Sequence, residues 1–146
     1  MKRRLWIAFA IVQACAPGPP QPEPVRVGED ACGHCRMTIV STDTAAQLVE
    51  PGAEPIMFDE IGCLQNFLVN TPLSAGAVVF VADHRTRGWI DARSAVFTRT
   101  SVPTPMSSGL LAHADVASRD ADPAVHGGTP IAVDTILGGR ARSARP

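Results

Sequence analysis

Short apolar runs separated by turn residues make up most of the chain beyond its amino-terminal end. Ile61, Leu64 and Leu68 recur at helical spacing and predict a helix over residues 60–69. Asp59 is its expected N-cap, since a carboxylate there can accept from the free backbone N–H groups of the first turn. β-branched and aromatic residues predict strands at residues 37–40, 46–49, 55–58 and 78–82. The last run is apolar throughout, which is typical of a strand buried on both faces.

The second half repeats this arrangement less clearly. Its apolar runs predict strands at residues 88–91, 95–98 and 130–133, and a helix over residues 110–120. Residues 55–61 match residues 130–136 at four of seven positions, 75 residues apart. A spacing this long does not fit a solenoid repeat. The echo therefore indicates either two related small units, each with a strand, a turn and a helix, or chance similarity among apolar residues.

The first residues have the features of an export signal. Three basic residues precede an apolar run over residues 5–12, which is too short to span a bilayer as a helix. The sequence Val-Gln-Ala-Cys that follows, ending at Cys15, resembles a bacterial lipobox. We therefore expect a signal peptide over residues 1–14, lipidation of Cys15, and a mature chain anchored on a membrane surface outside the cytoplasm. Ordinary secretion with cleavage at a nearby alanine is the alternative.

A proline-rich linker and a low-complexity tail flank the expected fold. Five prolines within residues 16–24 favour an extended, semi-rigid linker, which we place at residues 15–26. Residues 138–146 mix arginine with Gly, Ala and Ser and are expected to be disordered. Without residues 1–14, ten of the 13 basic residues remain against 14 acidic residues, a formal net charge near −4. Nucleic-acid binding is therefore disfavoured, because it needs concentrated positive charge.

The densest group of candidate metal ligands lies at residues 32–37, Cys-Gly-His-Cys-Arg-Met. Thiolates and thioethers favour Cu(I), whereas paired cysteines equally suit zinc or a redox-active disulfide. Met37 favours copper among these, because neither a structural zinc site nor a dithiol catalyst needs a thioether. In an extended segment Cys35 and Met37 point to the same face and could bind one ion. A plain structural disulfide between Cys32 and Cys35 also remains open in an oxidising compartment.

The remaining sulfur and imidazole groups are scattered. Cys63 falls on the apolar face of the predicted helix and is interpreted as a buried, inert thiol. Met57 is assigned to the core, whereas Met106 follows prolines in polar surroundings, where a loop could present it as a ligand. Among the histidines, His113 is a stronger candidate ligand than His84. No Ser-His-Asp arrangement, phosphate-binding glycine loop or pair of catalytic carboxylates occurs at convincing spacing.

Five features occur in an order that resembles a known family, the nitrous oxide reductase accessory lipoproteins known as NosL copper chaperones. They are Cys15, the cysteine-rich segment 32–37, and residues 58–64, 89–92 and 104–112. The likeness extends from about residue 27 to residue 137. Arg36 and Ser107 stand where the family tends to carry glycine. Arg36 also adds a positive charge near a cationic metal, unless its side chain points away from the ion.

The resemblance implies an α+β fold of two small ββαβ-type units in tandem, at residues 27–76 and 77–137. It also implies a non-enzymatic Cu(I) carrier on the periplasmic face of a bacterial membrane, with the outer membrane favoured. Such a carrier helps to load the copper–sulfur centre of nitrous oxide reductase. The expected ligands are Cys35, Met37 and Met106, with Cys32 and His113 as further candidates, for this ion or for a second metal such as zinc.

A function of a different class also fits the motif: an extracytoplasmic thiol–disulfide oxidoreductase acting through Cys32 and Cys35. The tetrapeptide Cys-Gly-His-Cys resembles the active site of thioredoxin-like disulfide isomerases, which place it at the start of a long helix. Here a predicted strand follows the motif, and this favours metal binding over redox catalysis.

Overall fold

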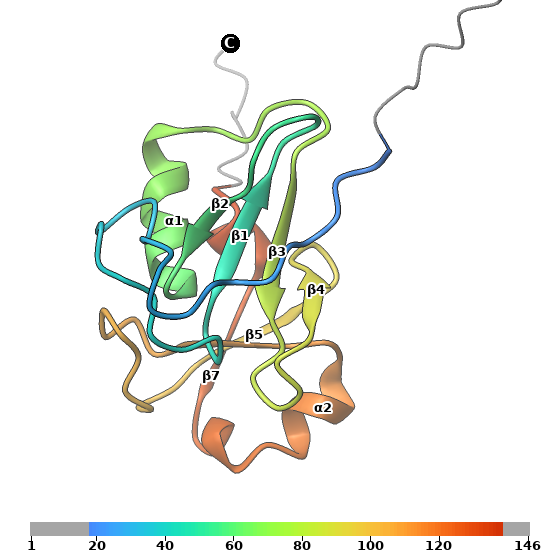
Figure 1. Ribbon diagram of the computed structural model, residues 1–146. Coiled ribbons are helices and arrows are strands. Elements are labelled where there is room, and N and C mark those ends of the chain that lie inside the picture. Colours follow the sequence, from blue (N-terminus) through green and yellow to red (C-terminus); the bar gives the residue numbers. More distant parts are fainter. Residues whose placement is uncertain (1–17, 139–146) are drawn as a thin grey trace, which may run out of the picture.

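The computed structural model describes residues 18–138 and contains two adjoining antiparallel sheets (Figure 1). One sheet has four strands in the order β2-β1-β3-β4, and the other has three in the order β6-β5-β7. The predicted α+β class is confirmed. The predicted signal peptide at residues 1–14, the lipidation site Cys15 and residues 139–146 of the predicted tail lie outside the described residues. Within residues 18–138, no helix has the length and apolar character needed to cross a membrane.

The first sheet packs against a single helix. Its strands are β1 (Ala46–Val49), β2 (Ile56–Phe58), β3 (Val78–Ala82) and β4 (Trp89–Asp91), and the helix is α1 (Ile61–Asn70). The register places Leu48 beside both Ile56 and Val79, so alternate side chains of three strands point to one face. Helix α1 covers that face and buries Leu64 against it. The predictions for these strands and this helix are confirmed.

The start of α1 differs from the prediction. Glu60 occupies the N-cap position, and its side chain makes no capping hydrogen bond. Asp59, the predicted cap, lies one residue earlier, and its carboxylate contacts Cys35 instead. The N-cap prediction is therefore wrong by one residue, and the difference frees the Asp59 carboxylate for another role.

The second sheet is accompanied by short helical segments. Its elements are β5 (Val96–Arg99), β6 (Leu110–His113), α2 (Val116–Asp120), η1 (Pro123–Val125), β7 (Thr129–Ile131) and α3 (Val133–Ile136). The helix predicted over residues 110–120 is wrong in its first part, where β6 pairs with β5. All four residues of β6 are buried, so their pattern lacks the alternation that distinguishes a strand from a helix. Helix α2 begins only after Asp115, whose side chain accepts from the N–H of Ser118.

Residues 37–40, predicted as a strand, form only an isolated bridge between Ala31 and Thr38. This segment folds back on residues 28–32 as a short, irregular hairpin. The N–H of Ile39 donates to the carbonyl of Asp30 at 2.9 Å. The segment is therefore a loop whose turn carries the cysteine-rich motif.

The two sheets share one hydrophobic core. Val79 of β3 and Phe97 of β5 belong to the same buried cluster. Asp83, directly after β3, forms a parallel bridge with Ala112 of β6 and so joins the sheets. Because β3 and β4 pair within the first sheet, the sheets divide between β4 and β5. The expected unit boundary between residues 76 and 77 stays a prediction.

The two segments of the sequence echo occupy similar places. β2 and β7 are both edge strands of their sheets, and each leads into a helix. The two helices, α1 and α3, pack against each other. This placement favours two related units over chance similarity.

The last residues of the proline-rich segment pack on the first sheet. Gln47 of β1 is fully buried, and its side-chain amide exchanges two hydrogen bonds of 2.9 Å with the backbone of Glu23. Val25 packs against the core. The segment thereby covers the face of β1 that points away from α1 (Figure 1), which explains why all four residues of β1 are buried.

Candidate metal centre

The cysteine-rich motif is held against β2 by its backbone. The N–H of Gly33 donates to the carbonyl of Met57 at 2.7 Å, and the N–H of Arg36 donates to that of Cys32 at 3.0 Å. A Cβ on Gly33 would lie 2.4 Å from the side chain of Ile56, so only glycine allows this close approach. The contact brings both cysteines of the motif to the start of α1.

Three thiols and one carboxylate converge there. Each of Cys32, Cys35, Asp59 and Cys63 offers one ligand atom, and these four atoms all lie within 4.8 Å of one another. We call this group the sulfur cluster. Three of its members are buried, whereas Cys35 is half-buried and faces solvent in part. All three cysteines are free thiols, so the alternative of a Cys32–Cys35 disulfide does not hold in this structure.

Asp59 supplies the carboxylate of the sulfur cluster. The Sγ of Cys35 donates to Oδ2 of Asp59 at 3.5 Å, while Oδ1 is buried and has no hydrogen-bond partner. Burial raises the pKa of the Cys35 thiol, and the neighbouring Cys32 and Asp59 raise it further. Burial and the contact with Asp59 likewise raise the pKa of Cys63. A buried carboxylate oxygen without a partner is costly, and a bound cation would compensate it.

Met37 and Met106 are tied to the edge of the sulfur cluster through their backbones. The carbonyl of Met37 accepts from the N–H of Cys32 at 2.8 Å, and the N–H of Met106 donates to Oε2 of Glu60 at 3.1 Å. The two residues are 54% and 47% exposed. Met57, in contrast, packs against the core. The binding of one ion by both exposed thioethers stays a prediction.

Two residues beside these methionines have left-handed backbone conformations. The φ angle is 66° at Arg36 and 62° at Ser107. These are the two positions at which the resembled family tends to carry glycine, the residue that adopts this conformation without a steric penalty. Both loops therefore keep a glycine-like shape with a side chain that strains it. The side chain of Arg36 is exposed.

The loop that carries Met106 is packed tightly on the start of α1. A Cβ on Gly62 would lie 2.5 Å from the Cβ of Ser108. Within the loop, the hydroxyl of Thr104 accepts from the N–H of Gly109 at 3.1 Å. The loop of the second sheet is thereby fixed next to the cysteines of the first.

Two members of the sulfur cluster were not expected as metal ligands. The sequence pattern indicates a helix cap for Asp59 and an inert core thiol for Cys63. Cys63 is indeed buried, but it lies beside the other thiols. The available signal was the spacing, since residues four apart at the start of a helix lie on one face.

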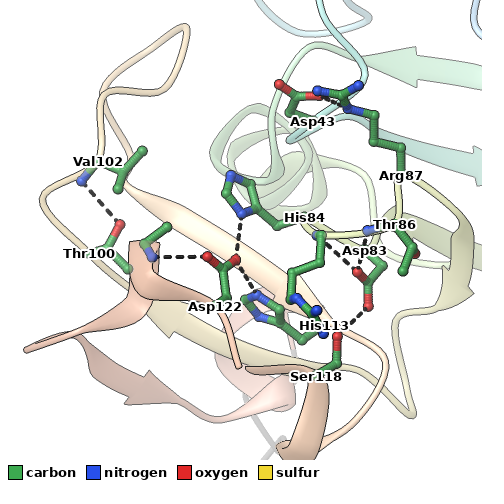
Figure 2. Close-up of polar contacts among 12 residues, drawn as sticks. Asp43, Asp83, His84, Thr86, Arg87, Thr100, Val102, His113, Ser118 and Asp122 are labelled. Atoms are coloured by element: carbon green, nitrogen blue, oxygen red, sulfur yellow. Dashed lines mark hydrogen bonds and ion pairs between the residues drawn. The ribbon is translucent and has the colours of Figure 1, made fainter. Parts of the chain in front are cut away.

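A second group of possible ligands lies where the two sheets meet. Ligand atoms of His84, His113 and Asp122 are within 4.8 Å of one another (Figure 2). Burial raises the pKa of Asp122, but hydrogen bonds from His113 and His84 outweigh it and lower this pKa to about 2. His113, a further candidate ligand, therefore belongs to this group and not to the sulfur cluster. No pattern in the sequence pointed to Asp122.

Comparisons with known proteins identify a structural neighbour. No family model matches the chain, and no curated protein matches it. Among solved structures, the copper chaperone NosL from Shewanella denitrificans matches with a TM-score of 0.66 at 20% sequence identity. The match covers 80% of this chain and 96% of that one. The resemblance inferred from the sequence is thus confirmed at the level of the fold: this chain is folded like that copper chaperone.

Proposed function

We propose that the protein is a membrane-anchored, non-enzymatic carrier of Cu(I). The observation that carries this proposal is the sulfur cluster itself: three free thiols converge, and only Cys35 among them is open to solvent in part. A solved structure with the same fold is a copper chaperone. Soft sulfur donors favour Cu(I) over harder cations.

The expected ligands are Cys35 as a thiolate and Met37 and Met106 as thioethers. Thiolate–metal bonds of about 2.3 Å put sulfurs around one ion about 4 Å apart, which fits the spacing of the cluster. Cys32 lies within the same reach and is a further ligand. Loading releases the proton of each thiol that becomes a ligand, and Asp59 already accepts the hydrogen bond of the Cys35 thiol.

Exposure of the thioethers suits a carrier better than a storage site. A carrier must give up its ion by ligand exchange, so a partner's ligands need to reach the metal. Met37 and Met106 are about half exposed, and Cys35 is half-buried. A partner could replace these ligands one at a time while the buried thiol of Cys32 still holds the ion.

The resemblance supplies the cellular setting of the proposal. The carrier would be attached through lipidated Cys15 to the periplasmic face of a bacterial membrane, with the outer membrane favoured. It would deliver copper for the copper–sulfur centre of nitrous oxide reductase. Fractionation of cells that express Cys15→Ser tests the anchor: the variant should be released or keep its signal peptide, and membrane retention of a correctly cleaved variant would contradict it.

The oxidoreductase alternative conflicts with the environment of the motif. Catalytic cysteines of disulfide exchange have a lowered pKa, commonly at a helix N-terminus. Burial raises the pKa of Cys35, and the motif lies in a loop. A purified protein that reduces insulin disulfides would restore this alternative.

Competition with a chromophoric Cu(I) chelator under anaerobic, reducing conditions tests the carrier proposal directly. The wild type should take one Cu(I) from the chelator, and X-ray absorption should show sulfur ligands only. Met57→Leu is a matched control, because Met57 packs in the core. The proposal would be refuted if the wild type left the copper with the chelator. It would also be refuted if the Cys35→Ser variant bound Cu(I) as tightly as the wild type.

A further inference from the structure

The pairing of the two sheets brings together two histidines that are far apart in the sequence. Asp83 bridges Ala112, and the N–H of His84 donates to the carbonyl of Ala112 at 2.9 Å. His84 therefore lies next to His113, the last residue of β6, and their ring centroids are 6.1 Å apart. Backbone pairing thus fixes the positions of both residues relative to each other.

Asp122 lies between the two rings. Its Oδ2 is 2.7 Å from Nδ1 of His84 and 2.9 Å from Nε2 of His113 (Figure 2). Its other oxygen accepts from the N–H of Ala124 at 2.9 Å, which fixes the carboxylate at the start of η1. Asp122 and His113 are buried, while the side chain of His84 is 21% exposed. Both imidazoles thus converge on one oxygen of Asp122 from different parts of the chain.

We propose that His84, His113 and Asp122 bind a divalent cation of borderline softness, with Zn²⁺ as the best fit. Imidazole nitrogen and carboxylate oxygen are zinc ligands, and three protein ligands with one open position are a common zinc arrangement. Ligand atoms around a tetrahedral zinc at about 2.0–2.1 Å are about 3.3 Å apart. The two nitrogen–oxygen distances need to open by only about half an ångström to admit the ion.

The chemistry of this group separates it from the sulfur cluster. It has no sulfur donor, so it suits a divalent ion and not Cu(I). The partial exposure of His84 gives a route for entry and leaves the fourth position to water. An ion here would join the turn after β3, the end of β6 and the N-cap of η1, and would so hold the two sheets together.

The environment of His113 limits the expected affinity. Metal-bound imidazoles usually donate their second N–H to an acceptor, and loss of such a partner commonly weakens binding about 10–100-fold. Nδ1 of His113 is buried and has no hydrogen-bond partner. We therefore expect this site to bind zinc more weakly than a fully supported site of the same ligands.

Zinc titration of the full chain, first loaded with Cu(I) to occupy the thiols, tests the inference, with X-ray absorption at the zinc edge to identify the ligands. The wild type should bind one Zn²⁺ through imidazole nitrogen and oxygen. His84→Gln should weaken this binding at least tenfold without changing Cu(I) affinity, and Asp122→Asn should do the same. His126→Gln is the matched control, because His126 is exposed and belongs to neither group.

Two results would overturn the inference. One is a wild-type protein whose zinc is bound through sulfur or not at all. The other is zinc binding that His84→Gln leaves unchanged in a protein that circular dichroism shows to be folded. The three residues would then be a hydrogen-bonded link between the sheets only.

Cu(I) binding is measured separately, so this site and the carrier proposal can fail independently. If the thiols do not load with copper, cobalt replaces zinc as the probe, since absorption by sulfur-to-cobalt charge transfer reveals thiol binding.

Discussion

The backbone N–H of Met106 donates to the carboxylate of Glu60, 46 positions earlier in the chain, at 3.1 Å. Glu60 is almost fully buried at the N-cap of α1 and directly follows Asp59. One hydrogen bond thus joins the methionine loop of the second sheet to the carboxylate end of the sulfur cluster. The position of Met106 should therefore depend on Glu60.

Replacing Glu60 tests this dependence. Glu60→Ala removes the acceptor of the Met106 N–H and should lower the free energy of unfolding by about 1–3 kcal/mol. It should also weaken Cu(I) binding, because the loop is no longer fixed. Glu60→Gln keeps an acceptor oxygen and is the control. In a double-mutant cycle with Met106→Leu, chelator competition should show non-additive losses of Cu(I) affinity; additive losses would mean that Glu60 acts on copper by another route.

Met106→Leu should lower Cu(I) affinity with little effect on the fold. A volume-conserving swap should change the free energy of unfolding by less than about 1.5 kcal/mol. X-ray absorption of the copper-loaded variant should count one sulfur fewer. Met57→Leu should leave both the copper spectrum and the affinity unchanged. If Met106→Leu behaves like Met57→Leu, Met106 has no part in the site.

Replacement by serine should have different effects at Cys35, in the loop, and at Cys63, in α1. Cys35→Ser should lose most Cu(I) affinity, because a hydroxyl is a hard, weak donor for a soft cation. Cys63→Ser should reduce stability more than Cu(I) affinity, since it buries a hydroxyl in a helix core. Chemical denaturation and chelator competition on both variants check this. Loss of binding in a folded Cys63→Ser protein with full binding in Cys35→Ser would reverse the assignment.

Arg36→Gly should stabilise the loop that carries Cys35. A left-handed non-glycine residue is strained by about 1–2 kcal/mol, and glycine removes this strain but adds chain entropy of about 0.5–1 kcal/mol in the unfolded state. The net gain in unfolding free energy should therefore lie between zero and about 1.5 kcal/mol. Arg36→Ala is the control, because it removes the charge and keeps the strain. Equal melting temperatures for the two variants would show that the backbone conformation is not the limiting factor.

Asp83 should make the stability of the fold depend on pH. Burial raises its pKa, but hydrogen bonds from the backbone of Thr86, Ala114 and Arg85 outweigh burial and lower the pKa below its usual value. Its contribution is therefore complete above the unfolded pKa of about 3.9 and is lost as the pH falls through the lower folded pKa. Asp83→Asn should cost about 1–3 kcal/mol at pH 7.

Urea unfolding of the metal-free protein from pH 7 to pH 3 measures this effect. The difference between the wild type and Asp83→Asn should narrow below about pH 4. Glu54→Gln, at an exposed carboxylate, should show no such trend. A difference that stays constant with pH would exclude a contribution from the ionised carboxylate.

Local patterns were sufficient to predict the first sheet and α1. The apolar residues of α1 recur at helical spacing, and the strands are short runs rich in β-branched and aromatic residues. β6 was mistaken for a helix because it is buried on both faces and shows no alternation. Cys63 was likewise misjudged from local sequence. Its apolar neighbours along the helix indicate a core residue, and the other thiols reach it only when residues 28–39 fold against α1.

Contacts between segments that are distant in the chain could not be predicted from local sequence patterns. His84 and Asp122 are 38 positions apart, and the bridge between Asp83 and Ala112 places His84 beside His113, the other partner of Asp122. Arg36 and Ser107 show the opposite case. The family resemblance marked both as departures from glycine, and the structure gives the reason, since both require a positive φ.

The hydrogen bonds between Gln47 and Glu23 determine how far the fold can move from an anchor. The folded part of the chain begins at Glu23, because its backbone is paired with a buried amide. With a lipid on Cys15, the tether is only residues 16–22, about 20 Å long at roughly 3.1 Å per residue in a polyproline conformation. The carrier would therefore exchange copper only with partners whose binding surface lies close to the same membrane, and lengthening this tether should widen the range of partners it can reach.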